Sequence, residues 1–273
     1  MNSAPDETPG AGSTGGADAS ADASAQKTPR RRGLRVLWWI LGSIGALIVA
    51  AVVAFLVWAN VGVMAAEPEA LAAVESDPSV TLTDEGDAWV LAPTEGASET
   101  GLVFIPGAKV EAEAYAATLV GAVQEGATVV ITKPTLNLAF FDFRPLSDFT
   151  ALAPDVSVWA VGGHSLGGVR ACQLAEDADA LVLFASYCAN DLSASDLPVL
   201  SIAGSKDGLS TPEKIAESAS LLPSDTEFVE IDGGNHAGFG AYGDQAGDNP
   251  ATISDEQIRA EITAALAPFL LAL

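Results

Sequence analysis

A serine flanked by glycines, between a predicted strand and a predicted helix, constrains the fold of this chain more than any other feature. The apolar run over residues 156–161 predicts a buried strand, and residues 169–175 predict a helix. Between them lies Gly163-His164-Ser165-Leu166-Gly167. The sharp turn needs glycine two residues from the serine on either side, because side chains there would collide. The pattern is that of a nucleophile elbow, which holds a serine Oγ above the end of a sheet.

Strands and helices alternate along residues 80–273 after an opening hairpin. The alternation predicts an α/β fold with a mainly parallel, doubly wound sheet, because continuous apolar strands need helices on both faces. A chain of 273 residues has room for one such domain with appendages. The predicted strands span residues 80–83, 87–91, 101–106, 127–132, 156–161, 181–185, 199–203 and 227–231, and the remaining helices span residues 111–124, 211–222 and 254–273.

An apolar segment precedes this domain. Residues 36–66 contain no charged side chain, and the most apolar part, residues 36–59, would extend about 36 Å as a helix. A hydrocarbon core is about 30 Å thick, so residues 34–60 predict a transmembrane helix. Trp38, Trp39 and Trp58 lie near its ends, where interfacial aromatic residues gather. A cleaved signal peptide has an apolar region of only about 7–15 residues.

The flanks of the apolar segment predict its orientation. Five basic residues precede it and none follows it before Lys109, so the positive-inside rule places the N-terminus in the cytoplasm. The predicted organisation is a disordered cytoplasmic tail over residues 1–33, a single-pass helix in the cell membrane, a solvated extracytoplasmic stalk over residues 61–79, and an extracytoplasmic domain over residues 80–273. The tail is predicted to be disordered because it has no large apolar residue after Met1.

The acidic balance of the chain excludes one class of partner. The formal net charge is −24, and the residues after Arg35 hold 32 acidic and seven basic side chains. A domain this acidic is repelled by nucleic acid and by anionic lipid head groups. No nucleic-acid partner is therefore expected. The sequence also predicts no metal site and no cofactor.

Two histidines limit the choice of a general base. His164 lies inside the elbow, next to the serine, and cannot also swing into position as its base. His236 follows the last predicted strand in a glycine-rich loop, the position expected for the base of such an elbow. Asp207, after the strand at residues 199–203, is the predicted acid that orients the imidazole. Asp191 is the alternative, while Asp232 lies only four residues before His236.

These motifs together resemble the α/β-hydrolase superfamily. Gly-His-Ser-Leu-Gly-Gly, Gly-Ser-Lys-Asp-Gly and Gly-Gly-Asn-His follow one another in the expected order over residues 80–273. The chain is most similar to the small serine hydrolases of the fold-5 type, related to the dienelactone hydrolases. The dienelactone hydrolases themselves use a cysteine nucleophile, where this chain has Ser165. The Leu166 N–H, at a helix N-terminus, is one expected oxyanion donor. The resemblance implies the Ala108 N–H as the second, although the loop lacks the longer glycine run of many relatives.

The resemblance implies hydrolysis of carboxylic esters or thioesters through an acyl-serine intermediate. The link over residues 186–197 is too short for an inserted lid, which suggests small-molecule substrates of modest size. Transfer of the acyl group to another acceptor, or a non-catalytic binding role, remains an alternative function. Four apolar side chains after a strand end either line an acyl pocket or pack a helix onto the sheet: Leu136, Leu138, Phe140 and Phe141.

Cys172 and Cys188 are the only two cysteines. A disulfide is chemically permitted in a domain outside the cytoplasm, and the two cysteines lie in neighbouring elements of one predicted strand–helix–strand unit. Free cysteine is also a common buried residue, so the sequence leaves both states open. Oligomeric state is not predicted.

Overall fold

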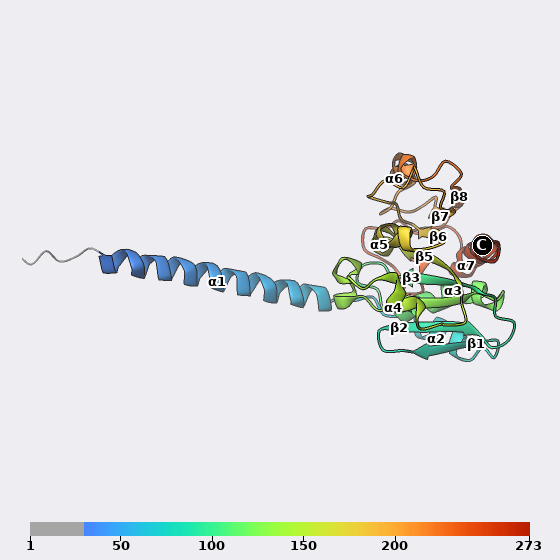
Figure 1. The fold of residues 1–273 in the computed structure, drawn as a ribbon, viewed down its shortest axis with the longest axis horizontal. Helices are drawn as coiled ribbons and strands as arrows, with labels where there is room; N and C mark the ends of the chain where they lie inside the picture. The colour runs from blue at the N-terminus through green and yellow to red at the C-terminus, as the bar shows by residue number, and fades with distance from the viewer. Residues whose placement is uncertain (1–29) are drawn as a thin grey trace, which may run out of the picture. The chain divides into compact units, whose positions relative to one another are not determined.

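A computed structural model describes residues 30–273, and it divides the chain into two compact units after Ala51. The first described element is helix α1, Arg30–Asn60 (Figure 1). Its segment Gly33–Asn60 has a mean hydropathy of 2.8 and is long and apolar enough to cross a membrane. The helix is a candidate transmembrane span. The predicted disordered tail, residues 1–33, lies outside the described residues except for its last four.

The second unit is built on an eight-stranded sheet with the order β1-β2-β4-β3-β5-β6-β7-β8. The first two strands are antiparallel to their neighbours, and all other pairs are parallel. The prediction of a mainly parallel sheet is therefore confirmed. The strands are β1 Val80–Asp84, β2 Ala88–Pro93, β3 Thr100–Ile105, β4 Thr128–Thr132, β5 Val158–His164, β6 Ala180–Phe184, β7 Val199–Gly204 and β8 Glu227–Ile231.

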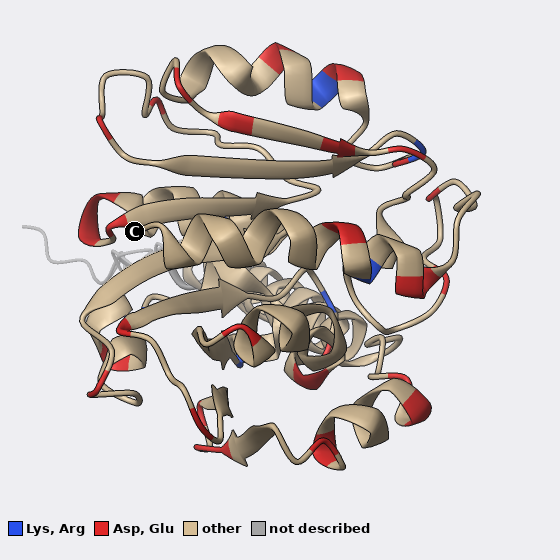
Figure 2. Ribbon diagram, turned by 90° about the vertical axis from the view of Figure 1, so that its right-hand side faces the viewer, with Lys and Arg blue, Asp and Glu red and all other residues tan. Residues whose placement is uncertain are grey.

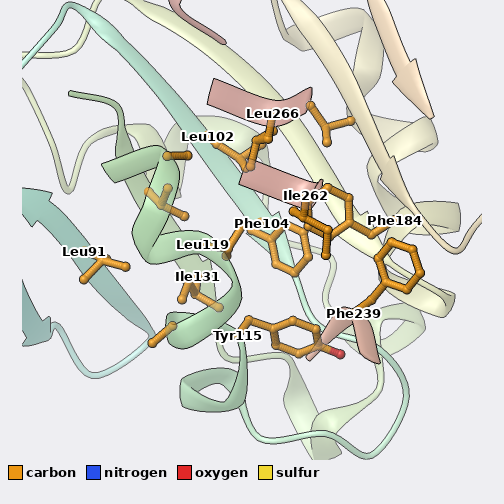
Figure 3. Close-up of a cluster of buried hydrophobic side chains, with 14 of the residues drawn as sticks. Leu91, Leu102, Phe104, Tyr115, Leu119, Ile131, Phe184, Phe239, Ile262 and Leu266 are labelled. Atoms are coloured by element: carbon orange, nitrogen blue, oxygen red, sulfur yellow. The ribbon is translucent and has the colours of Figure 1, made fainter. Parts of the chain in front are cut away.

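Two apolar cores lie on the two faces of this sheet. In β3, Leu102 and Phe104 point into one core, which holds α3 (Ala116–Gln124) and α7 (Asp255–Leu271) (Figure 3). Val103 and Ile105 point into the other core, with α4 (Leu146–Thr150) and α5 (Leu166–Leu174). Alternate side chains of a strand point to opposite faces, so strands covered on both sides are apolar throughout.

The segment predicted as a solvated stalk is instead packed on the domain. Residues 68–75 form helix α2 (Pro68–Glu75), whose Val74 is buried in the first core. Met64 pairs with Val110, and the Glu67 N–H donates to the Ala241 carbonyl. The prediction rested on the charged and proline residues here, but the apolar side chains between them cover the core. Residues 61–79 thus belong to the domain.

Element ends also differ from the predictions. The strand before the serine continues to His164, and α5 begins at Leu166, three residues before the predicted start. The helix predicted over residues 111–124 begins as a 3₁₀ helix, Ala112–Tyr115. Helix α6, Pro212–Ser218, is followed by a 3₁₀ turn. Ser254 caps α7 through a capping box with Gln257, as its sequence favours.

Candidate active site

The serine of the elbow lies in a backbone conformation that few residues other than glycine adopt. Ser165 has φ 53° and ψ −121°, between the end of β5 and the first residue of α5. A Cβ on Gly167 would lie 2.0 Å from the Ile105 carbonyl oxygen, and one on Gly163 would lie 2.5 Å from the Gly167 carbonyl carbon. Only glycine fits both places, so the elbow depends on both.

The predicted base and acid meet at the carboxyl ends of β8 and β7. His236 Nδ1 lies 2.8 Å from Asp207 Oδ2, and both side chains are buried. The other carboxylate oxygen of Asp207 accepts the N–H groups of Leu209 and Ser210, both at 2.7 Å. The carboxylate is therefore held from one side while it orients the imidazole on the other.

The two alternative acids lie elsewhere. Asp191 accepts the N–H and the hydroxyl of Ser193 in an exposed turn. Asp232 accepts the hydroxyl of Ser205. Among the carboxylates of the described residues, Asp207 is therefore the one that is hydrogen-bonded to His236.

His236 Nε2, the ring nitrogen that does not face Asp207, is available to accept a proton from a serine hydroxyl. His236 Nε2 is buried and makes no hydrogen bond within the described residues, and Ser165 Oγ also makes none. The His236 ring packs on the ring of His164, with centroids 4.5 Å apart. Because His164 immediately precedes Ser165, this contact places the predicted base beside the elbow.

The two expected oxyanion donors are also unpaired. Among the described residues, neither the Leu166 N–H nor the Ala108 N–H donates a hydrogen bond. Leu166 is the first residue of α5, where the aligned peptide dipoles favour a developing negative charge. Ala108 follows β3 in the loop that passes the elbow at Gly167. The arrangement suits stabilisation of an oxyanion.

A buried tyrosine that the sequence analysis did not single out joins the oxyanion loop to the elbow. Tyr115 Oη accepts the Gly107 N–H at 2.9 Å and lies 2.9 Å from His164 Nδ1. Since the hydroxyl accepts from Gly107, its own proton points to His164. A Cβ on Gly107 would lie 2.8 Å from His164 Nδ1. Tyr115 thus fixes the residue before Ala108 against the residue before Ser165.

The second histidine is held in its neutral form by its surroundings. Burial lowers the pKa of His164 well below 6.5, and repulsion from His236 lowers it further. The nearby His236 carbonyl raises the pKa, but this effect is smaller than that of burial. His164 is therefore neutral, and its Nδ1 accepts a hydrogen bond from the Tyr115 hydroxyl.

The pH dependence of stability tests this neutral state. The unfolded chain binds a proton at His164 below about pH 6.5, whereas the folded protein does not, so the free energy of unfolding falls as pH drops below 6.5. The slope from this residue reaches about 1.4 kcal/mol per pH unit. Urea unfolding of wild type and His164→Asn between pH 7.5 and 5 should give a shallower slope for the variant. Equal slopes would show that His164 takes up a proton in the folded state.

Asp248, which the sequence also did not predict, ties together the loops that carry the predicted acid and base. Asp248 accepts the Gly208 N–H through Oδ1 and the Ala237 N–H through Oδ2, each at 2.9 Å. These donors follow Asp207 and His236 directly in the chain. No local pattern marks Asp248, which stands in a polar loop like many other aspartates. Its role follows only from tertiary contacts.

The four predicted pocket residues do not all share one environment. Leu138 is buried, whereas Phe140 and Phe141 are exposed and Leu136 is partly buried. Leu136 lies in the 3₁₀ turn Thr135–Asn137, and Phe140 and Phe141 lie in the 3₁₀ turn Ala139–Phe141, which packs on α5. Leu138 is extended and joins the two turns. Their place beside the helix that follows Ser165 keeps a substrate contact open as a prediction.

The structure joins Cys172 to Cys188, the pairing that the sequence left open, with Cα atoms 5.6 Å apart. Cys172 lies in α5, and Cys188 follows β6. The bond joins two cysteines that are 16 positions apart in the sequence and closes the loop between them. Both cysteines are buried in the second core. The bond fixes the helix behind Ser165 to the loop after the next strand.

Reduction should therefore weaken the domain. A closed loop of this size is worth about 3 kcal/mol of unfolding free energy. Urea unfolding with and without reductant measures the loss, and mass spectrometry after alkylation of the unreduced, denatured protein should find no added alkyl group. Two added groups would contradict the bond.

Comparisons with known proteins agree with this fold. Residues 101–260 match the model of the alpha/beta hydrolase family. Among solved structures, the esterase domain of a protein from Rhodothermus marinus is similar, with 14% sequence identity, a TM-score of 0.51, and coverage of 67% of this chain and 90% of that one. No match was found among curated proteins. With more than half of its length matched, the chain belongs to the alpha/beta hydrolase family.

Proposed function

We propose that this protein is a serine hydrolase that cleaves carboxylic esters or thioesters through an acyl-serine intermediate. The observation that carries the proposal is the buried Asp207–His236 pair, 2.8 Å apart, packed against an elbow that presents Ser165. A carboxylate, an imidazole with a free Nε2, and a serine next to unpaired N–H groups are the parts that such acyl chemistry needs.

The mechanism uses each part in turn. His236 Nε2 takes the proton of Ser165 Oγ as that oxygen attacks the acyl carbonyl, and Asp207 stabilises the imidazolium. The N–H groups of Leu166 and Ala108 receive the oxyanion. The imidazolium then protonates the departing alcohol or thiol. Water, activated by His236, releases the acid and restores Ser165.

A fluorophosphonate probe tests the nucleophile, and a panel of p-nitrophenyl esters of graded chain length tests the reaction. We expect stoichiometric labelling and ester turnover. Folded protein that neither binds the probe nor turns over any ester would support a non-catalytic role. Product analysis with added alcohol or amine acceptors separates hydrolysis from acyl transfer, because transfer yields a new ester or amide.

We further propose that α1 anchors the protein in the cell membrane with the hydrolase domain outside the cytoplasm. The proposal rests on the apolar span Gly33–Asn60 and on the basic residues that precede it in the sequence. Protease added to intact cells should digest the domain while an N-terminal epitope tag stays protected. Loss of the tag with protection of the domain would reverse the orientation, and protection of both ends would contradict an exposed domain.

A further inference from the structure

We propose that an aromatic surface beside the active site, Phe140, Phe141 and Phe143, lies in the outer leaflet of the membrane that holds α1, so that the enzyme takes acyl esters from the bilayer. The inference rests on the proposed membrane anchoring and esterase function. It adds the surface through which the site receives its substrate and the phase in which that substrate is dissolved.

The first observation is the exposure of the three rings. Phe140, Phe141 and Phe143 are 49%, 42% and 82% exposed within four consecutive positions of the chain. A cluster of exposed aromatic side chains marks a contact surface rather than a core. Phe and Trp side chains are also the groups that proteins insert at the boundary of a lipid layer.

The second observation places this surface at the level of the membrane helix. The ring of Phe141 packs edge-on against the ring of Phe55, with centroids 5.6 Å apart. Phe55 lies within the span Gly33–Asn60, and five residues of α1 follow it, a rise of about 7.5 Å. If the span is in the bilayer, Phe141 lies at the depth of Phe55, inside the outer boundary.

The third observation is that the residues just after α1 are hydrogen-bonded to the oxyanion loop. The Met64 N–H donates to the Lys109 carbonyl at 2.7 Å, and Lys109 Nζ donates to the Val61 carbonyl at 2.7 Å. The same ammonium group lies 4.7 Å from the centre of the Trp58 ring. Lys109 follows Ala108 directly, so the chain that leaves α1 lies next to a proposed oxyanion donor.

The aromatic surface is fixed to the same loop. The Lys109 N–H donates to the Asn137 carbonyl at 2.7 Å, and residues 139–141 pack on α5, which begins after Ser165. The oxyanion loop therefore contacts both the chain that leaves the membrane helix and the segment that carries the aromatic rings. A long acyl chain that enters past these rings passes from lipid to Ser165 without crossing water.

Charge favours this face over the rest of the domain. The domain is strongly acidic, and Figure 2 shows acidic residues on many of its elements. Residues 134–145 hold only two charged side chains, Asp142 and Arg144, which form an ion pair. Burying an unpaired carboxylate in lipid is costly, whereas a paired one that is already buried adds little further cost. The segment is thus suited to a neutral or zwitterionic surface.

Depth-dependent quenching tests the surface directly. The full chain is placed in phosphatidylcholine vesicles with an environment-sensitive dye on one added cysteine, in Phe143→Cys, in Phe228→Cys or in Val49→Cys. Phe228 is the matched control, since it is 49% exposed but lies on β8, at the opposite end of the sheet from β1. Spin-labelled lipid should quench the dye at positions 143 and 49 and leave it bright at position 228.

Each outcome has a distinct meaning. Quenching at position 49 without quenching at position 143 overturns the proposed surface while leaving the anchor in place. Absence of quenching at position 49 overturns the anchor and the surface with it. A blue shift at position 143 that depends on protein density, without lipid quenching, shows contact between two copies of the chain and also overturns the proposal.

A kinetic measurement tests the substrate phase separately. The rate on p-nitrophenyl palmitate held in the vesicles is divided by the rate on p-nitrophenyl acetate in water. Phe143→Ser should lower this ratio at least about fivefold, and Phe228→Ser should leave it unchanged. An unchanged ratio in Phe143→Ser overturns delivery from the bilayer. If wild type hydrolysed neither substrate, the proposed esterase function itself would be contradicted.

Discussion

Replacement of Ser165 by alanine is expected to abolish fluorophosphonate labelling and to lower kcat for ester hydrolysis by about 10⁶-fold, the loss that follows removal of the nucleophile in other triads. The substitution removes only Oγ, which makes no hydrogen bond within the described residues. The backbone that holds the elbow is kept, because the Ser165 N–H donates to the Phe184 carbonyl and its own carbonyl accepts from Ser186 Oγ.

The folded state of Ser165→Ala must be shown beside the kinetics. Circular dichroism and the urea midpoint should match those of wild type, since alanine removes one partly exposed hydroxyl. Ser186→Ala is a useful contrast, because it removes a hydroxyl that donates to the Ser165 carbonyl at 2.7 Å and should weaken the elbow while leaving the labelling site. Retained esterase activity in folded Ser165→Ala would overturn the proposed nucleophile.

Much of the fold could be predicted because its signals are local. Glycine positions around Ser165 and the alternation of apolar strands with helices are properties of short segments, and the sheet follows from them. The position of His236 after the last strand also follows, since parallel strands bring their carboxyl ends to one edge. The segment over residues 61–79 could not be predicted, because its burial depends on contacts with Val110 and Ala241 far along the chain.

The supporting residues of the site escaped prediction for the same reason. Tyr115 reads as part of the apolar face of a helix, and its hydroxyl gains a role only where β3 and β5 bring Gly107 and His164 beside it. Asp248 joins two loops that lie 29 residues apart in sequence at Asp207 and His236. Such roles arise from the meeting of distant segments, and no spacing within one segment encodes them.

Replacement of Asp207, rather than of Asp191 or Asp232, is expected to have the second large effect on kcat. Asp207→Asn is expected to lower kcat by about 10⁴-fold while the protein stays folded. The introduced amide would keep its oxygen on the N–H groups of Leu209 and Ser210, which leaves its NH₂ group facing His236 Nδ1. An NH₂ donor requires an unprotonated Nδ1, so the neutral imidazole would carry its proton on Nε2 and could not accept one from the serine.

Matched variants separate this tautomer effect from a general loss of charge. Asp191→Asn and Asp232→Asn also remove one carboxylate each, but those side chains bond Ser193 and Ser205 rather than His236. Both should retain nearly all activity. Asp207→Asn should also show a rate that rises with pH as hydroxide replaces the missing base. If Asp191→Asn were the crippled variant and Asp207→Asn were mild, the acid would come from the loop after β6, and the hydrogen bond between Asp207 and His236 would serve structure alone.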